Sequence, residues 1–194
     1  MLRGQRVMLR PVEWADQAQI VAWRNEPHVM RGLFSHRPLS LAQQEQWFAA
    51  YLNRQDERLF IVEAEGGTPI GTVGLTNIDF RNRRAEYGRM LIGGRSYLRR
   101  GYATEATLLL LDYAFEELNL HRIYLKVLAD NDAAVRLYRR CSFEVEGRYR
   151  DAYFAEGRFH DVLIMAVLDQ AHLAARRSAA GHRGEGWDEP PSGI

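Results

Sequence analysis

Two arginines and a glycine stand directly before an apolar helical run in the stretch YLRRGYATEATLLLLDYAFEEL, residues 97–118. A helix N-terminus leaves backbone N–H groups unpaired and carries partial positive charge, so it attracts phosphate. Arg99 and Arg100 add full charges, and Gly101 lets the main chain approach a ligand because it has no Cβ. The stretch is either a pyrophosphate site or a plain loop with two solvated arginines before a core helix. The sequence contains neither GxxxxGK followed by Ser or Thr nor GxGxxG after a strand, which excludes the two standard nucleotide loops.

A tyrosine and a cysteine follow an asparagine in a second stretch, NDAAVRLYRRCSF, residues 131–143. Asn131 or Asp132 can cap a helix here, because both side chains accept hydrogen bonds from free backbone N–H groups. Tyr138 and Cys141 belong to the apolar side of that helix, and on this pattern alone Tyr138 is a core residue. Cys141, the only cysteine, excludes an intramolecular disulfide and is expected to be a small core residue rather than a nucleophile.

Composition and charge narrow the function classes. Lys and Arg total 26 against 25 Asp and Glu, so the net charge of +1 does not favour a nucleic acid as partner. The histidines are scattered without an HExxH motif or a cysteine partner, and GxSxG is absent, which disfavours metal sites and serine triads. The chain lacks the apolar run of a signal peptide or a membrane span, and its cysteine usage gives no sign of an oxidising compartment. We therefore expect a soluble, cytoplasmic protein that uses no metal.

Hydrophobic periodicity predicts the elements that must position these residues. Ser40 is an expected helix N-cap, and Gly66 and Gly67 mark an expected hairpin turn. From residue 171 the chain gains Gly, Pro and Ser, so residues 171–194 are expected to form a flexible tail beyond a single domain of residues 1–170. The predicted strands are residues 7–12, 59–64, 70–77, 85–92 and 121–129, with a long hairpin over 143–168; the predicted helices are residues 14–22 and 41–52, the run after Gly101, and residues 130–141.

In RRGYATEA and NDAAVRLYRRCSF the chain resembles the GCN5-related N-acetyltransferases, in particular their RimJ/RimL-like branch. The first stretch is similar to the family's coenzyme A pyrophosphate loop, and the second to its motif N-x-x-A-x-x-L-Y-x-x-x-G-F. WRNEPHV and SLAQQEQWF are also similar to this branch, so the resemblance covers residues 1–168. Leu98 stands where the family usually has Gln or Arg, and Ser142 stands where it has glycine. The resemblance implies an α+β fold: one domain with a mixed, mostly antiparallel sheet of about seven strands, flanked by about four helices, with a splayed strand pair for coenzyme A.

Acetyl-CoA is the acetyl donor that the resemblance implies. Its pantetheine would pair with the strand over 85–92, where backbone N–H groups near Met90, Leu91 and Ile92 polarise the thioester carbonyl. Asn131 is similar to the family asparagine that hydrogen-bonds the cofactor, and Arg140 to the basic residue near its 3′-phosphate. The alternatives for these two residues are a helix cap and a solvated surface charge. The implied pyrophosphate loop consists of Leu98, Arg99, Arg100, Gly101, Tyr102, Ala103 and Thr104.

Two side chains match catalytic positions of the family. Tyr138 is similar to the general acid that protonates the leaving thiolate, which makes catalysis an alternative to core packing for this residue. Glu86 is similar to a glutamate that takes the amine proton through water, and its alternative is a structural hydrogen-bond acceptor. The resemblance implies direct attack of a neutral amine on the thioester through a tetrahedral intermediate, without an acetyl-enzyme.

Residues 13–57 and 148–160 correspond to the walls of the acceptor site in the family. The branch implies a protein or peptide N-terminal amine of the ribosomal-protein type as acceptor. A nucleotide amino sugar is the alternative, because a basic lip can hold a carboxylate or a diphosphate. Polyamines and aminoglycosides rank behind both, since a polyamine needs several carboxylates and those of residues 13–57 are matched by arginines. A non-catalytic acyl-CoA-binding module is a further alternative to an enzyme. The aromatic hairpin over 149–159 either pairs two copies of the chain into a homodimer or forms a wall of the substrate site.

Overall fold

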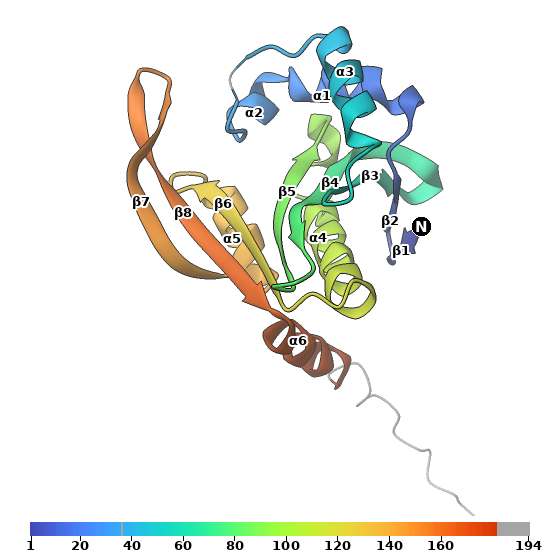
Figure 1. Cartoon of the computed structure of the whole chain (residues 1–194), viewed down its shortest axis with the longest axis vertical. Helices are drawn as coiled ribbons and strands as arrows, with labels where there is room; N and C mark the ends of the chain where they lie inside the picture. Colours follow the sequence, from blue (N-terminus) through green and yellow to red (C-terminus); the bar gives the residue numbers. More distant parts are fainter. Residues whose placement is uncertain (36, 182–194) are drawn as a thin grey trace, which may run out of the picture.

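The computed structural model describes residues 1–35 and 37–181 and contains one mixed sheet of eight strands. The strand order is β1-β2-β3-β4-β5-β6-β8-β7, and every neighbouring pair is antiparallel except β5 and β6 (Figure 1). The chain crosses from β5 to β6 through a helix, as a parallel pair requires. The strands are β1 (Leu2–Arg3), β2 (Val7–Pro11), β3 (Arg58–Ala64), β4 (Thr68–Asp79), β5 (Arg84–Ile92), β6 (Arg122–Leu128), β7 (Glu144–Ala155) and β8 (Arg158–Leu168).

Helices cover both faces of the sheet. In β3, Leu59 and Ile61 pack with the early helices, whereas Phe60 and Val62 pack with the later ones. This burial on both faces explains why the strand reads as a continuous apolar run. Ser40 caps the third helix by accepting a hydrogen bond from the Gln43 N–H at 3.2 Å, as predicted. The early helices are α1 (Gln17–Arg24), α2 (Pro27–Met30) and α3 (Leu41–Tyr51); the later ones are α4 (Tyr102–Asp112), which continues into a π-helical turn (Tyr113–Glu117), and α5 (Asp132–Arg140).

The α+β class and the mostly antiparallel mixed sheet are confirmed, and the described chain adds three elements to those predicted. The strand β1 has two residues and the helix α2 has four, both too short to show a period. The third is α6 (Asp169–Gly181), a helix where a flexible tail is predicted from residue 171. His172 in α6 is 1% exposed, and its Nε2 lies 2.6 Å from Oδ1 of Asp112. Residues 182–194 of the predicted tail lie outside the described residues.

The parallel strands β5 and β6 separate after three residue pairs. Arg84, Ala85 and Glu86 pair with residues 122–124, and beyond Glu86 the two strands share no ladder. Beyond this point β6 stays paired with β8 as far as Leu128 and β5 stays paired with β4, so each of the two strands has an open edge toward the other (Figure 1). The predicted splayed pair is therefore present.

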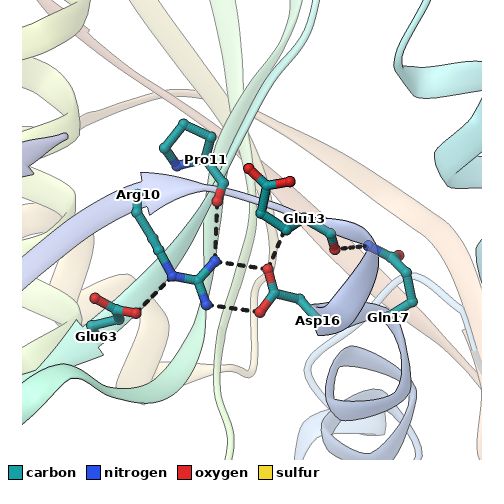
Figure 2. Close-up of polar contacts among 6 residues, drawn as sticks. All are labelled: Arg10, Pro11, Glu13, Asp16, Gln17 and Glu63. Carbon is teal, nitrogen blue, oxygen red and sulfur yellow. Dashed lines mark hydrogen bonds and ion pairs between the residues drawn. The ribbon is translucent and has the colours of Figure 1, made fainter.

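A network of ion pairs joins the first helices to the sheet (Figure 2). Arg10 in β2 donates two hydrogen bonds of 2.7 Å to the carboxylate of Asp16 and one of 2.6 Å to Glu63 in β3. Asp16 also accepts the backbone N–H of Glu13 at 2.8 Å, which fixes the chain just before α1. Burial alone would raise the pKa of Asp16, but the bonds from Arg10 and from the Glu13 N–H outweigh it and hold that pKa below its usual value. The network thus sets where α1 starts relative to the sheet.

We predict that Arg10→Met lowers the free energy of unfolding by about 3 kcal/mol at pH 7, because it leaves two carboxylates of low exposure without their cation. The ion pair of Asp16 stabilises the fold above the unfolded-state pKa of about 4 and loses this effect as pH falls through the lower folded-state pKa. The difference between the two proteins should therefore shrink as pH falls from 7. Urea unfolding measures it, with Arg3→Met in exposed β1 as the control that changes stability little; equal losses in both variants would contradict the prediction.

Candidate active site

The loop before α4 has the backbone conformation of an anion-binding turn. Arg99 and Gly101 adopt left-handed φ values of 59° and 87° on either side of Arg100. Alternation between right- and left-handed residues directs successive backbone N–H groups toward one side, where they bind anions. Gly101 is also the N-cap of α4, so the free N–H groups of the first helical turn adjoin this loop. The residues proposed from sequence for a pyrophosphate thus lie together.

Arg6 and Glu105 hold this loop against the first strands. Glu105 in the first turn of α4 accepts the backbone N–H groups of Arg6 at 2.7 Å and of Val7 at 3.2 Å. The Arg6 guanidinium donates to the Arg100 carbonyl at 3.0 Å and lies 5.5 Å from the Tyr102 ring centroid. Sequence reasoning missed this pair because its members are 99 residues apart and Arg6 belongs to no motif.

A β-bulge lies in the part of β5 that has no partner in β6. Thr72 of β4 pairs with Leu91, but Gly74 pairs with Gly88, so β5 carries one extra residue between them. Arg89 takes φ 56° there, and its carbonyl accepts a hydrogen bond from Thr72 Oγ1 at 2.5 Å.

The backbone N–H group of Ile92 in β5 faces the open edge beyond this bulge. The Gly93 N–H donates to the Ile70 carbonyl in β4, and N–H groups alternate between the two edges of a strand. The N–H group of Ile92 therefore points away from β4, toward the gap between β5 and β6, whereas Met90 lies within the bulge, where this alternation is interrupted. Of the backbone groups expected from sequence near Met90, Leu91 and Ile92, that of Leu91 faces β4 instead.

Tyr138 packs beside the unpaired part of β5. Its ring centroid lies 5.7 Å from that of Tyr87 in β5 and 5.8 Å from that of Phe143. Thr107 donates its hydroxyl hydrogen to the Ala103 carbonyl, so the Tyr87 hydroxyl must donate to Thr107 Oγ1, 2.8 Å away. The Tyr138 hydroxyl has no hydrogen-bond partner among the described residues, and burial raises its pKa, so it stays protonated. Tyr138 is both a packing residue and a free hydroxyl at the edge of the gap.

Glu86 stands at the last paired position before the strands separate. Ala85 and Tyr87, its neighbours in β5, face α4, so the Glu86 side chain points to the opposite face, which carries α1 and α3. It is half-buried, and its Oε2 accepts a hydrogen bond from Asn77 Nδ2 at 2.9 Å. This leaves Oε1 available to a water molecule or a ligand.

The remaining residues proposed from sequence lie on or beside α5. Asn131 caps the helix: its Oδ1 accepts the Ala134 N–H at 3.2 Å. Arg140 is exposed in the last turn. Next to it, Cys141 is fully buried with Sγ 3.9 Å from the Thr104 carbonyl, and burial raises the pKa of its thiol to about 12. Ser142 has φ 66°, the left-handed conformation for which the family motif has glycine.

A cavity of about 300 Å³ lies on the other face of β5. It is bounded by α1, the segment after α2, α3 and the central strands, and Arg89 and Leu91 bring β5 into its wall. The ring of Phe34 in this wall lies 5.1 Å from the ring of Tyr153 in β7, so the long hairpin closes against it. We call this space the acceptor pocket. Within residues 1–35 and 37–181, no group of His, Cys, Asp and Glu side chains is arranged to hold a metal ion, and no helix is long and apolar enough to cross a membrane.

Comparisons with known proteins point to one family. Residues 6–144 match the model of the acetyltransferase (GNAT) domain. A spermidine N(1)-acetyltransferase of Escherichia coli K12 is 32% identical over 178 residues, 92% of this chain and 94% of that protein. A putative ribosomal N-acetyltransferase of Bacillus subtilis is 28% identical over 165 residues, 83% and 88% of the two chains.

A solved structure extends the likeness to the fold. The spermidine N-acetyltransferase of Vibrio cholerae, in complex with CoA and spermine, superimposes with a TM-score of 0.80 at 33% identity, over 87% of this chain and 98% of that one. These relatives support the acetyltransferase family, but they do not support the RimJ/RimL-like branch that the sequence motifs suggested.

We predict that the Cys141 thiol does not react with a thiol-specific dye while the protein is folded. At pH 8 a thiol with a pKa of about 12 is almost wholly protonated, and the thiolate is the reactive form. Dye absorbance should show no fast reaction in buffer and one thiol per chain in urea. Rapid labelling of the folded protein would contradict both the burial and the raised pKa.

Proposed function

The chain belongs to the acetyltransferase (GNAT) family, and on this premise we propose that it transfers the acetyl group of acetyl-CoA to the primary amine of a small molecule. The observation that carries the proposal is the open, bulged edge of β5, which leads through a short 3-10 turn (Arg95–Tyr97) to the left-handed loop at the N-terminus of α4. The small acceptor pocket on the other face of β5 supports a small molecule, as do the named activities of the relatives.

Several groups fit coenzyme A. The loop over 98–104 would hold the pyrophosphate through its backbone N–H groups, with Arg99 and Arg100 adding charge. The open edge of β5 would pair with the pantetheine amides, since its free N–H and C=O groups need hydrogen-bond partners. The amide of Asn131 would also hydrogen-bond the cofactor, and the guanidinium of Arg140 would lie near its 3′-phosphate.

Different groups of the chain would each perform one role in acetyl transfer. Acetyl-CoA, when bound, supplies the activated acetyl thioester. The N–H groups of Met90 and Ile92 would stabilise negative charge on the carbonyl oxygen. Glu86 would take the amine proton, directly or through water, with Asn77 orienting its carboxylate. Tyr138 would donate its hydroxyl proton to the departing sulfur.

The proposal needs no covalent acetyl-enzyme. Cys141 is the only cysteine, its thiol is buried beside the Thr104 carbonyl, and its raised pKa disfavours the thiolate. Direct transfer to the amine therefore agrees better with the described site than a two-step route.

A protein or peptide N-terminal amine is the second candidate acceptor. The similarity to a putative ribosomal N-acetyltransferase supports it, and so does the position of the long hairpin beside the acceptor pocket. Thiol release from acetyl-CoA, measured with a thiol-reactive dye over small amines, polyamines, aminoglycosides, nucleotide amino sugars and peptides, separates the two. If acetyl-CoA binds and no amine is acetylated, a non-catalytic acyl-CoA-binding module replaces the enzyme.

We predict that Gly101→Glu abolishes acetyl-CoA binding measured by calorimetry. Its Cβ would lie 2.8 Å from Arg6 Nη2, and its carboxylate would oppose the pyrophosphate. Gly157→Glu is the matched control, because Gly157 also has a left-handed φ of 78° but nothing within 4 Å of its Cβ position. Both variants carry backbone strain of about 1 kcal/mol. Equal affinity in the two variants would remove the loop from the cofactor site.

We predict that Tyr138→Phe lowers kcat at least about tenfold while acetyl-CoA affinity changes only a few-fold, because the ring packing stays and a proton donor is lost. Tyr87→Phe is the control: it deletes a neighbouring hydroxyl that is bonded to Thr107, so it should lower stability by about 1 kcal/mol and spare turnover. Steady-state kinetics and thermal melting of both variants test this, and unchanged turnover in Tyr138→Phe would leave the residue a packing role alone.

A further inference from the structure

The acceptor pocket is lined by two arginines and, among the described residues, by no carboxylate. Arg24 comes from the last turn of α1, and Arg89 comes from the bulge of β5. The rest of the described lining is apolar or uncharged, and it includes Phe34 and Trp47. A pocket whose wall carries arginines and no carboxylate attracts anions and repels cations.

Arg89 has its own counter-ion within the protein. Two of its nitrogens lie 2.9 and 3.1 Å from Oε1 of Glu57, and its guanidinium lies 4.8 Å from the Trp47 ring centroid. Arg54 occupies the other carboxylate oxygen of Glu57 at 2.9 Å. Glu57 is only 2% exposed and is therefore fully used by these two arginines. Both of its oxygens already accept hydrogen bonds from an arginine, and Glu57 is not among the residues that line the pocket.

Arg24 is the cation without a counter-ion. It is half-buried, and no carboxylate or other hydrogen-bond acceptor within the described part of the chain reaches its guanidinium. Burial lowers the pKa of Arg24, and the charge of Arg89 lowers it further. The C-terminal end of α1 offers only about half a negative charge.

Arg10, in contrast to Arg24, is an arginine whose charge is compensated by groups of the protein itself. Its side chain is 20% exposed, and its guanidinium has two carboxylates and a carbonyl as partners (Figure 2). A partly buried charge without a counter-ion lowers the stability of the folded protein, and an apolar residue at the same position would avoid this loss. The missing partner of Arg24 is therefore expected to arrive with a ligand.

We propose that the acceptor is a small amine that also carries a carboxylate or phosphate group, and that Arg24 binds this anionic group. The inference rests on the proposed function, because the same pocket borders the bulge of β5 where the amine must react. A guanidinium recognises either anion through paired N–H groups. The volume of about 300 Å³ is at the lower end for small-molecule sites. Spermine, which the Vibrio relative binds, has only cationic groups and fits this pocket poorly.

Binding to the CoA-loaded protein tests the proposal without any need for turnover. Calorimetry would compare two pairs, glucosamine 6-phosphate with glucosamine and β-alanine with β-alanine amide, and would include spermidine. We expect the member with the anionic group in at least one pair to bind at least about tenfold more tightly than its twin without that group and than spermidine, a factor that one charge-assisted pair supplies. The responding pair identifies the anion as phosphate or carboxylate.

Two substitutions at one position assign the effect to Arg24. Arg24→Gln should remove the preference for the anionic twin, whereas Arg24→Lys should keep most of it. Arg24→Gln removes an unpaired charge, so its melting temperature should not fall, which separates loss of binding from loss of fold.

Three results would overturn the proposal: equal binding of the twins, stronger binding of spermidine, or no binding by any member. Thiol release with the same compounds then reports on the enzyme separately. Anion-selective binding without acetyl transfer would contradict the proposed function but support the anion site at Arg24. Acetyl transfer without a preference for the anionic compounds would support the proposed function but contradict the anion site.

Discussion

The structure depends on one strand that loses its hydrogen-bonding neighbour in the middle of a sheet. After Glu86, β5 has no partner on the β6 side, although both strands continue. Backbone groups in a fold need partners, so such an edge persists only where water or a ligand satisfies it. The bulge at Arg89 lies in this open part of β5, and the left-handed loop before α4 follows the strand along the chain. An extended, amide-containing cofactor ending in phosphates matches this arrangement.

Packing on both sides keeps the gap open. On one face, the rings of Tyr87, Tyr138 and Phe143 fill the space between β5 and α5. Along the other side of the gap, β6 is committed to β8 over its full length and cannot follow β5. The Arg10 network holds α1 against the first strands, so the acceptor pocket on the second face of β5 has a rigid wall. One strand thereby separates a cofactor edge from an acceptor space.

The arginines on this face of the sheet differ in whether a carboxylate of the protein contacts them. Arg10, Arg54 and Arg89 each contact a carboxylate of low exposure and are accounted for by the fold. Arg24 belongs to the same helical layer and lines the same pocket as Arg89, yet the described chain supplies it with no acceptor. Relatives named for spermidine share the fold at 32–33% identity, which fixes the reaction type more firmly than the acceptor, because acceptor walls come from loops and helix ends.

The sequence by itself determined what depends on neighbours along the chain. Apolar periods located the strands and long helices, Ser40 and the Gly66–Gly67 turn were visible as local signals, and residues 99–106 could be compared with the family's pyrophosphate loop because they are consecutive. The helices α2 and α6 were not predicted from the sequence. The four residues of α2 are too few to show a period, and the polar composition of α6 gives no sign that it packs through His172. Only the tertiary structure decided which arginine has a counter-ion and which lacks one, because pairs such as Arg10–Glu63 and Arg89–Glu57 join residues far apart in the sequence. The charge of the acceptor pocket is such a property: it depends on which side chains meet in space.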